Sequence, residues 1–287
     1  MSYVALITGA SSGIGEATAR RLAALGAEHD LRLVLVARRA ERLQELADQL
    51  DCAVTVIAAD LTDPAAAQRL AQTVEREHGE LHLLINNAGA RWSATFAEGG
   101  WENLARHLQV NLEAPARLVE ALLPLLTRTA AGVAPRTQAP TRQQRRTLDL
   151  ADPRAPVAIV NVASTSARVA RRGTGGYAAS KFALAGWSDS LALELAALGV
   201  HVGLVLPGFV ATEGFPQAEL LASARTRWLV ADPSLVAQAI LQAGPGGRPE
   251  RYAPRYYWLF GALRMIAPRL LSRAMNRGTF TTATRSR

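Results

Sequence analysis

The sequence contains a single cysteine, Cys52, among its 287 residues. One thiol cannot form an internal disulfide or supply a multi-cysteine metal cluster, so we expect no metal site. A chain without disulfides fits a reducing compartment, and the cytoplasm is the expected location. For Cys52 itself we expect the ordinary role of a small buried side chain at the start of a strand.

Long apolar runs are also absent. The first residues lead directly into a short apolar stretch, without the basic region and long apolar segment of a secretory signal. No stretch is long enough to span a bilayer. Apolar residues make up 49% of the chain and charged residues 20%, which is typical of a globular protein with a sizeable core. The length favours one large domain over two small ones.

Acidic residues are in the minority, because 24 Asp and Glu stand against 32 Lys and Arg, for a formal net charge of +8. Such an excess is compatible with nucleic acid, anionic lipid or a phosphorylated ligand. Many of the arginines fall in residues 136–154 and 251–287. Because no zinc-finger or aromatic RNA-binding signature accompanies them, we expect no nucleic-acid partner.

Short apolar runs alternate with longer helical patterns along most of the chain. Runs without polar alternation are typical of parallel strands buried on both faces. Their alternation with helices predicts an α/β fold, a doubly wound, Rossmann-like parallel sheet flanked by helices, in a single domain over residues 1–250. The expected strands are Tyr3–Thr8, Leu31–Ala37, Ala53–Ala59, Leu81–Asn86, Val157–Val162 and Val200–Leu206. The expected helices are Gly13–Leu25, Arg39–Leu50, one capped by Asp63 and Pro64, Trp101–Leu126 and Tyr177–Leu198.

Two segments depart from this alternation. Residues 128–156 are rich in Arg, Thr, Gln, Ala and Pro, and predict a flexible insert because few large apolar side chains can order it. A polyanion-binding arm is the alternative. Residues 251–287 form a basic and apolar C-terminal extension. It could pack against the body or a second subunit, cover the substrate site, or make peripheral contact with a membrane, and we favour packing.

A glycine-rich turn follows the first expected strand and leads directly into a helix. Glycines in such a turn let the backbone approach a pyrophosphate, whose charge is stabilised by the N-terminus of the helix. The sequence therefore predicts a dinucleotide site at this turn. Its expected contacts are Gly9, Ser11, Ser12, Gly13, Ile14 and Gly15.

The end of the second expected strand indicates which dinucleotide binds. Proteins that bind NAD usually place an acidic side chain here, which accepts hydrogen bonds from the ribose 2′-hydroxyl. This chain has Arg38 and Arg39 instead, and a guanidinium group pairs well with a 2′-phosphate. The alternative, two solvated arginines at the start of a helix, is less favoured because cations destabilise a helix N-terminus. We therefore expect NADP(H).

With its later segments, the sequence resembles the compact type of the short-chain dehydrogenase/reductase family from residue 3 to about residue 243. The resemblance rests on several segments in the family's order. They are the glycine turn, Asp60-Leu61-Thr62, Asn86-Asn87-Ala88-Gly89, Val110-Asn111-Leu112, Ser164, Tyr177-Ala178-Ala179-Ser180-Lys181 and Pro207-Gly208 with Thr212. Ser164 precedes Tyr177 by 13 residues, which is the separation usual in the family.

The resemblance implies an NADP(H)-dependent oxidoreductase that interconverts a carbonyl and an alcohol, and a homodimer or other homo-oligomer. It implies Asn111, Ser164, Tyr177 and Lys181 as the catalytic set, with Asn111 holding a water. Further cofactor contacts are implied at Asp60, Leu61, Asn87, Ala88, Gly89, Tyr177, Lys181, Pro207, Gly208, Val210 and Thr212.

The chemistry of these side chains supports the same roles. Tyr177 and Lys181 are four residues apart and project from one face of a helix. A free tyrosine titrates near pH ~10, and a nearby ammonium group and the oxidised nicotinamide would both lower the pKa of Tyr177. The tyrosine would then give a proton to a carbonyl oxygen, to which Ser164 donates a hydrogen bond. A non-catalytic NADP(H)-binding redox sensor is one alternative, but a sensor needs no proton relay. A membrane-tethered interaction protein, which would rest on the basic insert and tail, is the other.

The substrate is the least defined feature. The C-terminal segment resembles family members that act on lipids, retinoids or steroids, which predicts an apolar ketone or alcohol. The apolar side chains of Phe209–Trp228 predict a lid, with Phe215, Leu220, Leu221 and Trp228 as its members. Arg91, Trp92, Arg168 and Arg171 lie on loops near the expected site and are compatible with an anionic or bulky substrate, a role that surface arginines seldom have.

Overall fold

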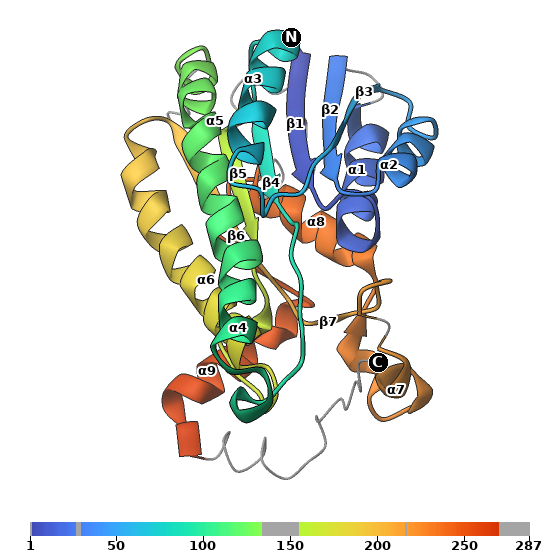
Figure 1. The fold of residues 1–287 in the computed structure, drawn as a ribbon, viewed down its shortest axis with the longest axis vertical. Helices are drawn as coiled ribbons and strands as arrows, with labels where there is room; N and C mark the ends of the chain where they lie inside the picture. The colour runs from blue at the N-terminus through green and yellow to red at the C-terminus, as the bar shows by residue number, and fades with distance from the viewer. Residues whose placement is uncertain (1, 27–29, 134–154, 216, 270–287) are drawn as a thin grey trace.

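The protein folds around one parallel sheet of seven strands, in the order β3-β2-β1-β4-β5-β6-β9 (Figure 1). The computed structural model describes residues 2–26, 30–133, 155–215 and 217–269. The strands are β1 Ser2–Thr8, β2 Asp30–Ala37, β3 Ala53–Ala58, β4 Leu83–Asn86, β5 Val157–Val162, β6 Val200–Pro207 and β9 Glu250–Ala253. The expected doubly wound, Rossmann-like sheet is confirmed.

Helices cover both faces of the sheet (Figure 1). The residues of α1, α2 and α8 share one buried cluster with the sheet, and those of α3, α5 and α6 share a second cluster on the opposite face. The helix bounds are α1 Gly13–Gly26, α2 Ala40–Ala47, α3 Ala66–His78, α4 Phe96–Leu108, α5 Ala114–Ala131, α6 Gly175–Ala196, α7 Ala218–Ala222, α8 Pro233–Ala243 and α9 Trp258–Ile266.

Strand β1 shows why the sheet is buried on both sides. Val4 and Leu6 belong to the cluster on one face, and Ala5 and Ile7 belong to the cluster on the other. All four side chains are fully buried. Because successive side chains of a strand point to opposite faces, two helical layers require an unbroken apolar run. Each buried Val, Leu or Ile side chain stabilises the fold by roughly 1.5–3 kcal/mol.

The sheet continues past residue 250, where the C-terminal extension was expected to begin. Glu250–Ala253 forms β9, which pairs in parallel with Leu204–Pro207 of β6 as the seventh strand. A strand of four residues at the edge of a sheet needs no apolar run, and this one contains Glu250, Arg251 and Tyr252. Its sequence therefore carries no strand pattern.

The expected helix over Trp101–Leu126 consists of three elements. Helix α4 begins earlier, at Phe96, because Thr95 and Glu98 form a capping box. A π-helical turn, Gln109–Glu113, then connects it to α5. Helix α5 continues to Ala131, so the first residues of the expected insert at 128–156 are helical. Residues 134–154 of that insert lie outside the described residues.

Helix α3 also begins later than expected. Pro64 lies in a turn, and the first helical residue is Ala66. The carboxylate of Asp63 still accepts a hydrogen bond from the Ala65 N–H, at 3.0 Å. Within the described ranges, no helix is both long and apolar enough to cross a bilayer.

Candidate active site

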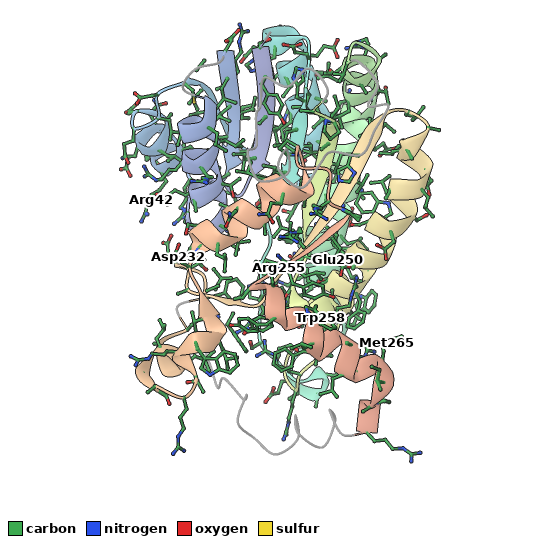
Figure 2. All side chains as sticks on the ribbon, turned by 180° about the vertical axis from the view of Figure 1, so that it is seen from behind. Arg42, Asp232, Glu250, Arg255, Trp258 and Met265 are labelled. Carbon is green, nitrogen blue, oxygen red and sulfur yellow. The ribbon has the colours of Figure 1, made fainter. Side chains whose placement is uncertain are left out.

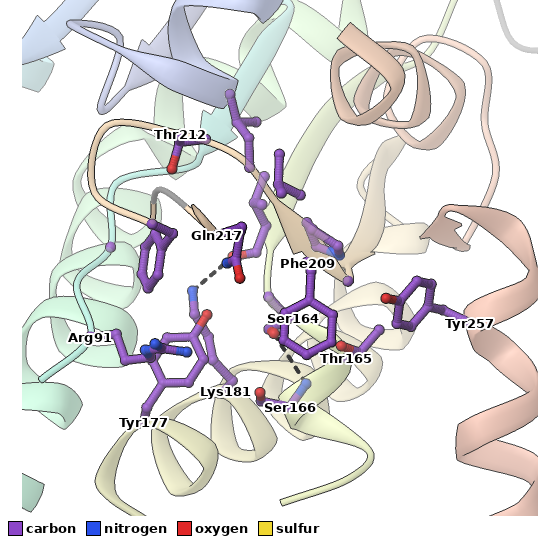
Figure 3. Close-up of a pocket in the computed structure, with 18 of the residues that line it drawn as sticks. Arg91, Ser164, Thr165, Ser166, Tyr177, Lys181, Phe209, Thr212, Gln217 and Tyr257 are labelled. Carbon is purple, nitrogen blue, oxygen red and sulfur yellow. Dashed lines mark hydrogen bonds between the residues drawn. The ribbon is translucent and has the colours of Figure 1, made fainter. Parts of the chain in front are cut away.

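A pocket opens at the carboxyl ends of the central strands, with about 1130 Å³ of empty space including its mouth (Figure 3). The strand order reverses between β1 and β4, and ligands of doubly wound sheets bind outside such a reversal. The lining comes from the glycine turn, the segments that follow β4, β5 and β6, the first turns of α6, and the segment that begins α9.

The glycine turn has a shape that only glycine permits. Gly9 and Gly13 have φ angles of +67° and +59°, in the left-handed region. A Cβ atom on Gly15 would overlap the carbonyl oxygen of Gly9 and lie 2.8 Å from Asn87 Nδ2. The turn can therefore approach a ligand closely and begin α1 at the same point.

Hydrogen bonds join this turn to the segment after β4. The hydroxyl oxygen of Thr8 accepts the N–H groups of Asn87 and Ala88, both at 3.0 Å. The side-chain amide of Asn87 donates to the Thr8 carbonyl at 2.9 Å. Gly89 follows, where a Cβ atom would lie 2.9 Å from Asn111 Oδ1. The two glycine segments expected to bind the cofactor are thus adjacent.

Arg39 contacts the glycine turn, whereas Arg38 lies close enough to Asp60 to lower the pKa of that carboxylate. One Arg39 Nη atom donates to the hydroxyls of Ser11 and Ser12 at 3.2 and 3.0 Å, and the other donates to both carboxylate oxygens of Glu213 at 2.9 and 3.0 Å. Arg38 is exposed. Only Arg39 of the two arginines is therefore seen at the glycine turn, its partner Glu213 was not indicated by the sequence, and a 2′-phosphate contact of either arginine stays a prediction.

Asp60 lies beyond the end of β3, exposed to solvent. Its carboxylate accepts hydrogen bonds from the N–H and the hydroxyl of Thr62, at 2.9 and 2.8 Å. These bonds, with a smaller contribution from Arg38, lower the pKa of Asp60. Asp60 and Leu61 do not line the pocket, which is consistent with the expected contact at the adenine end of a dinucleotide.

A dinucleotide fits these residues. The turn leads into the N-terminus of α1, whose free N–H groups would bind a pyrophosphate, and the close approach of Ala88 leaves no space for a side chain at Gly9. Ile14, Asn87, Pro207 and Thr212 all line the pocket that contains Tyr177, so one ligand can extend from the turn to the tyrosine.

Tyr177, Ser164 and Lys181 lie on the same pocket (Figure 3). Burial raises the pKa of Tyr177, and Ser164, Arg91 and Arg171 act in the opposite direction. Lys181 is not among the groups that lower this pKa, although the sequence led us to expect it, and its Nζ lies 5.9 Å from the centre of the Tyr177 ring. In this structure the cations that favour the phenolate are the two arginines.

Lys181 is the only lysine in the sequence, and its side chain is buried. Its Nζ donates to the carbonyl oxygen of Val162 at 2.9 Å. No ion pair involves this amine within the described residues, and burial lowers its pKa to about 8. The ammonium group is thus held in the pocket at a cost to stability.

Asn111 lies in the π-helical turn between α4 and α5. Its side chain donates to the Ala90 carbonyl and the Ser180 hydroxyl at 3.0 and 3.1 Å, and accepts the Ala90 N–H at 3.0 Å. These bonds tie the loop after β4 to α6. The side chain is therefore a positioning group, and a water held by Asn111 stays a prediction.

His107 is a site residue that the sequence analysis missed. It is fully buried, with its ring 6.1 Å from that of Tyr177 and 5.1 Å from that of Trp92. Its Nε2 accepts the Trp92 N–H at 3.0 Å, so Nδ1 donates to the Asn103 carbonyl at 2.6 Å. Burial lowers the pKa of His107, and the neutral ring supports one side of Tyr177.

The four loop residues near the expected site have different positions. Arg91 and Arg171 line the pocket. Trp92 packs against His107, and Arg168 pairs with Glu250 of β9 at 2.6 Å. The sequence could not show which of the four line the pocket, because their distances from Tyr177 depend on how the loops fold.

The expected lid is confirmed only in part. Phe215 lines the pocket and Leu220 is buried, but Leu221 and Trp228 are 46% and 58% exposed. Tyr257 lines the pocket, whereas Leu221 and Trp228 do not. Its buried ring lies against Gly208, and its hydroxyl donates to the Leu229 carbonyl at 2.8 Å.

The first residues of the expected C-terminal extension both pack on the body and line the pocket, through Tyr257 and Phe260. On the outer side of α9, Trp258 and Met265 are exposed (Figure 2). The described part of this segment therefore packs against the body and also lines the pocket, and its role as a cover for a substrate stays a prediction. Contact with a membrane stays a prediction.

Replacing Lys181 with methionine is expected to stabilise the protein at pH 7. Below pH 8 the folded state holds a buried charge whose pKa, about 8, is well under the unfolded value of ~10.4, a penalty of roughly 3 kcal/mol. Loss of the hydrogen bond to Val162 costs about 1 kcal/mol of this gain. We therefore expect the free energy of unfolding, measured in urea, to rise by about 1–2 kcal/mol.

The gain should shrink as the pH rises from 8 toward ~10.4, because the unfolded wild-type chain binds a proton in this range that the folded chain has released. Titration of Lys181 therefore makes the wild-type free energy of unfolding increase with pH in this range, and the methionine variant lacks that increase. As Lys181 is the only lysine, NMR of protein labelled at lysine reports its pKa directly. A pKa above 10 would contradict the prediction.

Comparison with known proteins agrees with this geometry. The family model for short chain dehydrogenase matches residues 3–134 and 144–219. A rhamnolipids biosynthesis 3-oxoacyl-[acyl-carrier-protein] reductase of Pseudomonas aeruginosa is 32% identical over 261 residues, covering 87% of this chain and 86% of its own. An uncharacterized oxidoreductase of Staphylococcus epidermidis is 31% identical over 209 residues, covering 73% and 78%.

Solved structures share the fold over nearly the whole length. A short-chain dehydrogenase from Streptomyces avermitilis has a TM-score of 0.71 and 27% identity, covering 97% of this chain and 98% of its own. A short chain dehydrogenase/reductase from Burkholderia phymatum, in complex with NAD, has a TM-score of 0.71 and 25% identity, covering 92% and 93%. The chain is therefore an oxidoreductase that belongs to the short-chain dehydrogenase/reductase family.

Proposed function

We propose that the protein is an NADP(H)-dependent oxidoreductase that interconverts a carbonyl and an alcohol, with Tyr177 as the acid and base. The observation that carries the proposal is the pocket, in which Tyr177, Ser164 and Lys181 face the segments that border the glycine turn. The substrate has an apolar part, because Phe209, Phe215, Leu229 and other apolar side chains form much of the wall.

Each group of side chains has a task toward the cofactor. The glycine turn would hold the pyrophosphate, and Arg38 and Arg39 would hold the 2′-phosphate. Asp60 would contact the adenine, Lys181 the ribose of the nicotinamide half, and the segment Pro207–Thr212 the nicotinamide. When bound, the nicotinamide supplies or accepts a hydride.

The proton chemistry belongs to the chain itself. In reduction, the Tyr177 hydroxyl donates its proton to the carbonyl oxygen, and the Ser164 hydroxyl donates a hydrogen bond that stabilises the developing negative charge. In oxidation, the Tyr177 phenolate removes the proton of the alcohol. Asn111 keeps the Ala90 loop against α6 and thereby keeps the pocket wall beside Lys181 in place.

Two relatives bear on the reaction and the cofactor. The 3-oxoacyl-[acyl-carrier-protein] reductase of Pseudomonas aeruginosa supports reduction of a carbonyl. The Burkholderia structure holds NAD, so preference for NADP(H) rests on Arg38 and Arg39 of this chain. A redox sensor without catalysis would have no use for the Tyr177 pocket.

The experiment that tests the proposal is oxidation of NADPH and NADH with ketones, aldehydes, quinones and 3-oxoacyl thioesters. We expect turnover with NADPH and a preference over NADH that falls by about 10–100-fold in Arg38→Asp, because a charge-assisted bidentate contact is lost. Arg21→Asp, an exposed site on α1, makes the same charge change and should keep the preference. Equal preference before and after Arg38→Asp would refute the role of Arg38.

The proposal also includes a small-molecule substrate, a homodimer or other homo-oligomer, and a cytoplasmic location. Contact with a membrane would use the exposed apolar side of α9, where Trp258, Leu259 and Ile266 face solvent. Gel filtration tests the oligomer, and elution as a monomer would contradict it. Sedimentation with anionic vesicles tests the membrane contact, which would be contradicted if the protein did not pellet with the vesicles.

A further inference from the structure

The pocket at Tyr177 carries positive charge without a compensating acid. Three cationic side chains, those of Arg91, Arg171 and Lys181, line it, and no Asp or Glu is among the described residues of the lining. Arg91 follows β4 and Arg171 precedes α6, so residues 80 positions apart converge on one site. Figure 3 shows Arg91 on the same side of the pocket as Tyr177.

Neither arginine has a partner for its guanidinium group within the described parts of the chain, in ion pairs or in side-chain hydrogen bonds. Other partly buried arginines do have one, such as Arg168 with Glu250 at 2.6 Å and Arg39 with Glu213 at 2.9 Å. Burial lowers the pKa of both Arg91 and Arg171, and the two charges repel each other. Such an arrangement destabilises the folded chain unless an anion joins it.

Aromatic rings hold both guanidinium groups in position. Arg91 Cζ lies 5.0 Å from the centre of the Phe215 ring, and Arg171 Cζ lies 4.7 Å from that of Phe209. Stacking of this kind uses the face of the guanidinium plane and leaves the N–H donors at its edge available. Two oriented sets of donors suit the two oxygens of a carboxylate.

The cofactor does not account for this pair. A pyrophosphate would lie at the glycine turn, and a 2′-phosphate at Arg38 and Arg39, which do not line this pocket. Arg91 and Arg171 instead act on Tyr177, whose pKa both of them lower. An anion bound between them therefore belongs to the molecule whose oxygen meets Tyr177.

We propose that Arg91 and Arg171 bind a carboxylate of the substrate, which makes the substrate an oxo acid or the corresponding hydroxy acid. The inference rests on the proposed function, because it places this group next to the carbonyl that Tyr177 serves. Leu229, Tyr257 and Phe260 then contact the apolar part of the same molecule.

Binding of non-reacting ligands tests the site without turnover. In calorimetry with saturating NADPH, 4-tert-butylbenzoate should bind the wild-type protein at least ~10-fold more tightly than 4-tert-butylbenzamide. Arg91→Met and Arg171→Met should each reduce this ratio by about 10-fold, since methionine keeps an apolar stem and removes the charge. Arg172→Met is the control, because Arg172 is exposed and does not line the pocket.

Equal affinity for benzoate and benzamide, or an unchanged ratio in both variants, would overturn the inference. A ratio that also falls in Arg172→Met would mean long-range attraction and would overturn it too. A third arm uses 4-tert-butylphenyl phosphate. If it binds tighter than the benzoate and depends on the same arginines, the site is for a phosphate and the carboxylate assignment fails.

Kinetics separate this inference from the proposed function. With 4-acetylbenzoate and its methyl ester, the ratio of kcat/KM should favour the acid and fall about 10-fold in either arginine variant. If neutral ketones are reduced but the acid has no advantage, the carboxylate site fails and the oxidoreductase stands. If benzoate binding depends on Arg91 and Arg171 but no carbonyl is reduced, the carboxylate site stands and the proposed oxidoreductase activity fails.

Discussion

Replacing Tyr177 with phenylalanine is expected to lower kcat for carbonyl reduction by about 10²–10⁴-fold, the contribution of a positioned general acid. The ring and its contact with His107, 6.1 Å between centres, should survive, so the pocket keeps its shape. NADPH binding should therefore be retained, because phenylalanine keeps the ring and removes only the hydroxyl, whose single hydrogen bond is worth about 1 kcal/mol. Stopped-flow turnover and fluorescence titration of NADPH measure the two quantities.

Tyr256→Phe is the matched control for this prediction. Its hydroxyl donates to the Trp228 carbonyl at 2.7 Å and lies outside the pocket. Turnover should stay near the wild-type value there. Unchanged turnover in Tyr177→Phe would contradict the assigned mechanism, whatever the control shows.

The pH dependence of alcohol oxidation follows from the same residue. Oxidation needs the phenolate of Tyr177, so its rate should rise with pH through the pKa of this group. Because burial raises that pKa, the rising limb should lie on the alkaline side. Arg91→Met removes a cation that lowers the pKa of Tyr177, so the limb should move further toward high pH.

Replacing Gly15 with alanine is expected to damage both the fold and the cofactor site. The new Cβ would overlap the Gly9 carbonyl and lie 2.8 Å from Asn87 Nδ2, so the turn must move away from the segment after β4. Overpacking of this kind costs about 1–3 kcal/mol of unfolding free energy. NADPH affinity should fall as well, because a displaced turn no longer presents its backbone N–H groups to the pyrophosphate.

Gly186→Ala provides the control for that variant. Gly186 lies in α6 and is exposed, and a Cβ atom added there would meet no other atom within 4 Å. Alanine should therefore stabilise the helix by about 0.5–1 kcal/mol. Urea unfolding and NADPH titration of the two variants give the comparison. Normal NADPH affinity in Gly15→Ala would show that the turn does not need glycine at this position.

Much of the site could be predicted because it depends on local patterns. Unbroken apolar runs such as that of β1 indicate a buried parallel sheet, and the glycine turn requires φ angles that other residues avoid. Tyr177 and Lys181 share a helix face through their spacing alone. Ser164 and Asn87 follow strands of one parallel sheet, so their side chains reach the same edge.

Other features had no local pattern. Strand β9 contains Glu250, Arg251 and Tyr252, and only its pairing with β6 identifies it. The contact of Arg39 with Glu213 joins residues 174 positions apart. The interruption between α4 and α5 by a π-helical turn depends on the side-chain bonds of Asn111 to Ala90 and Ser180.

The sequence by itself determined the parallel sheet, the glycine turn and the side chains that follow each strand, because these depend on the order and spacing of residues. Only the tertiary structure decided which cations surround Tyr177. The sequence pointed to Lys181, whereas Arg91 and Arg171 are the groups that lower its pKa. Charge interactions depend on distance and burial, and both are set by loops that are far apart along the chain.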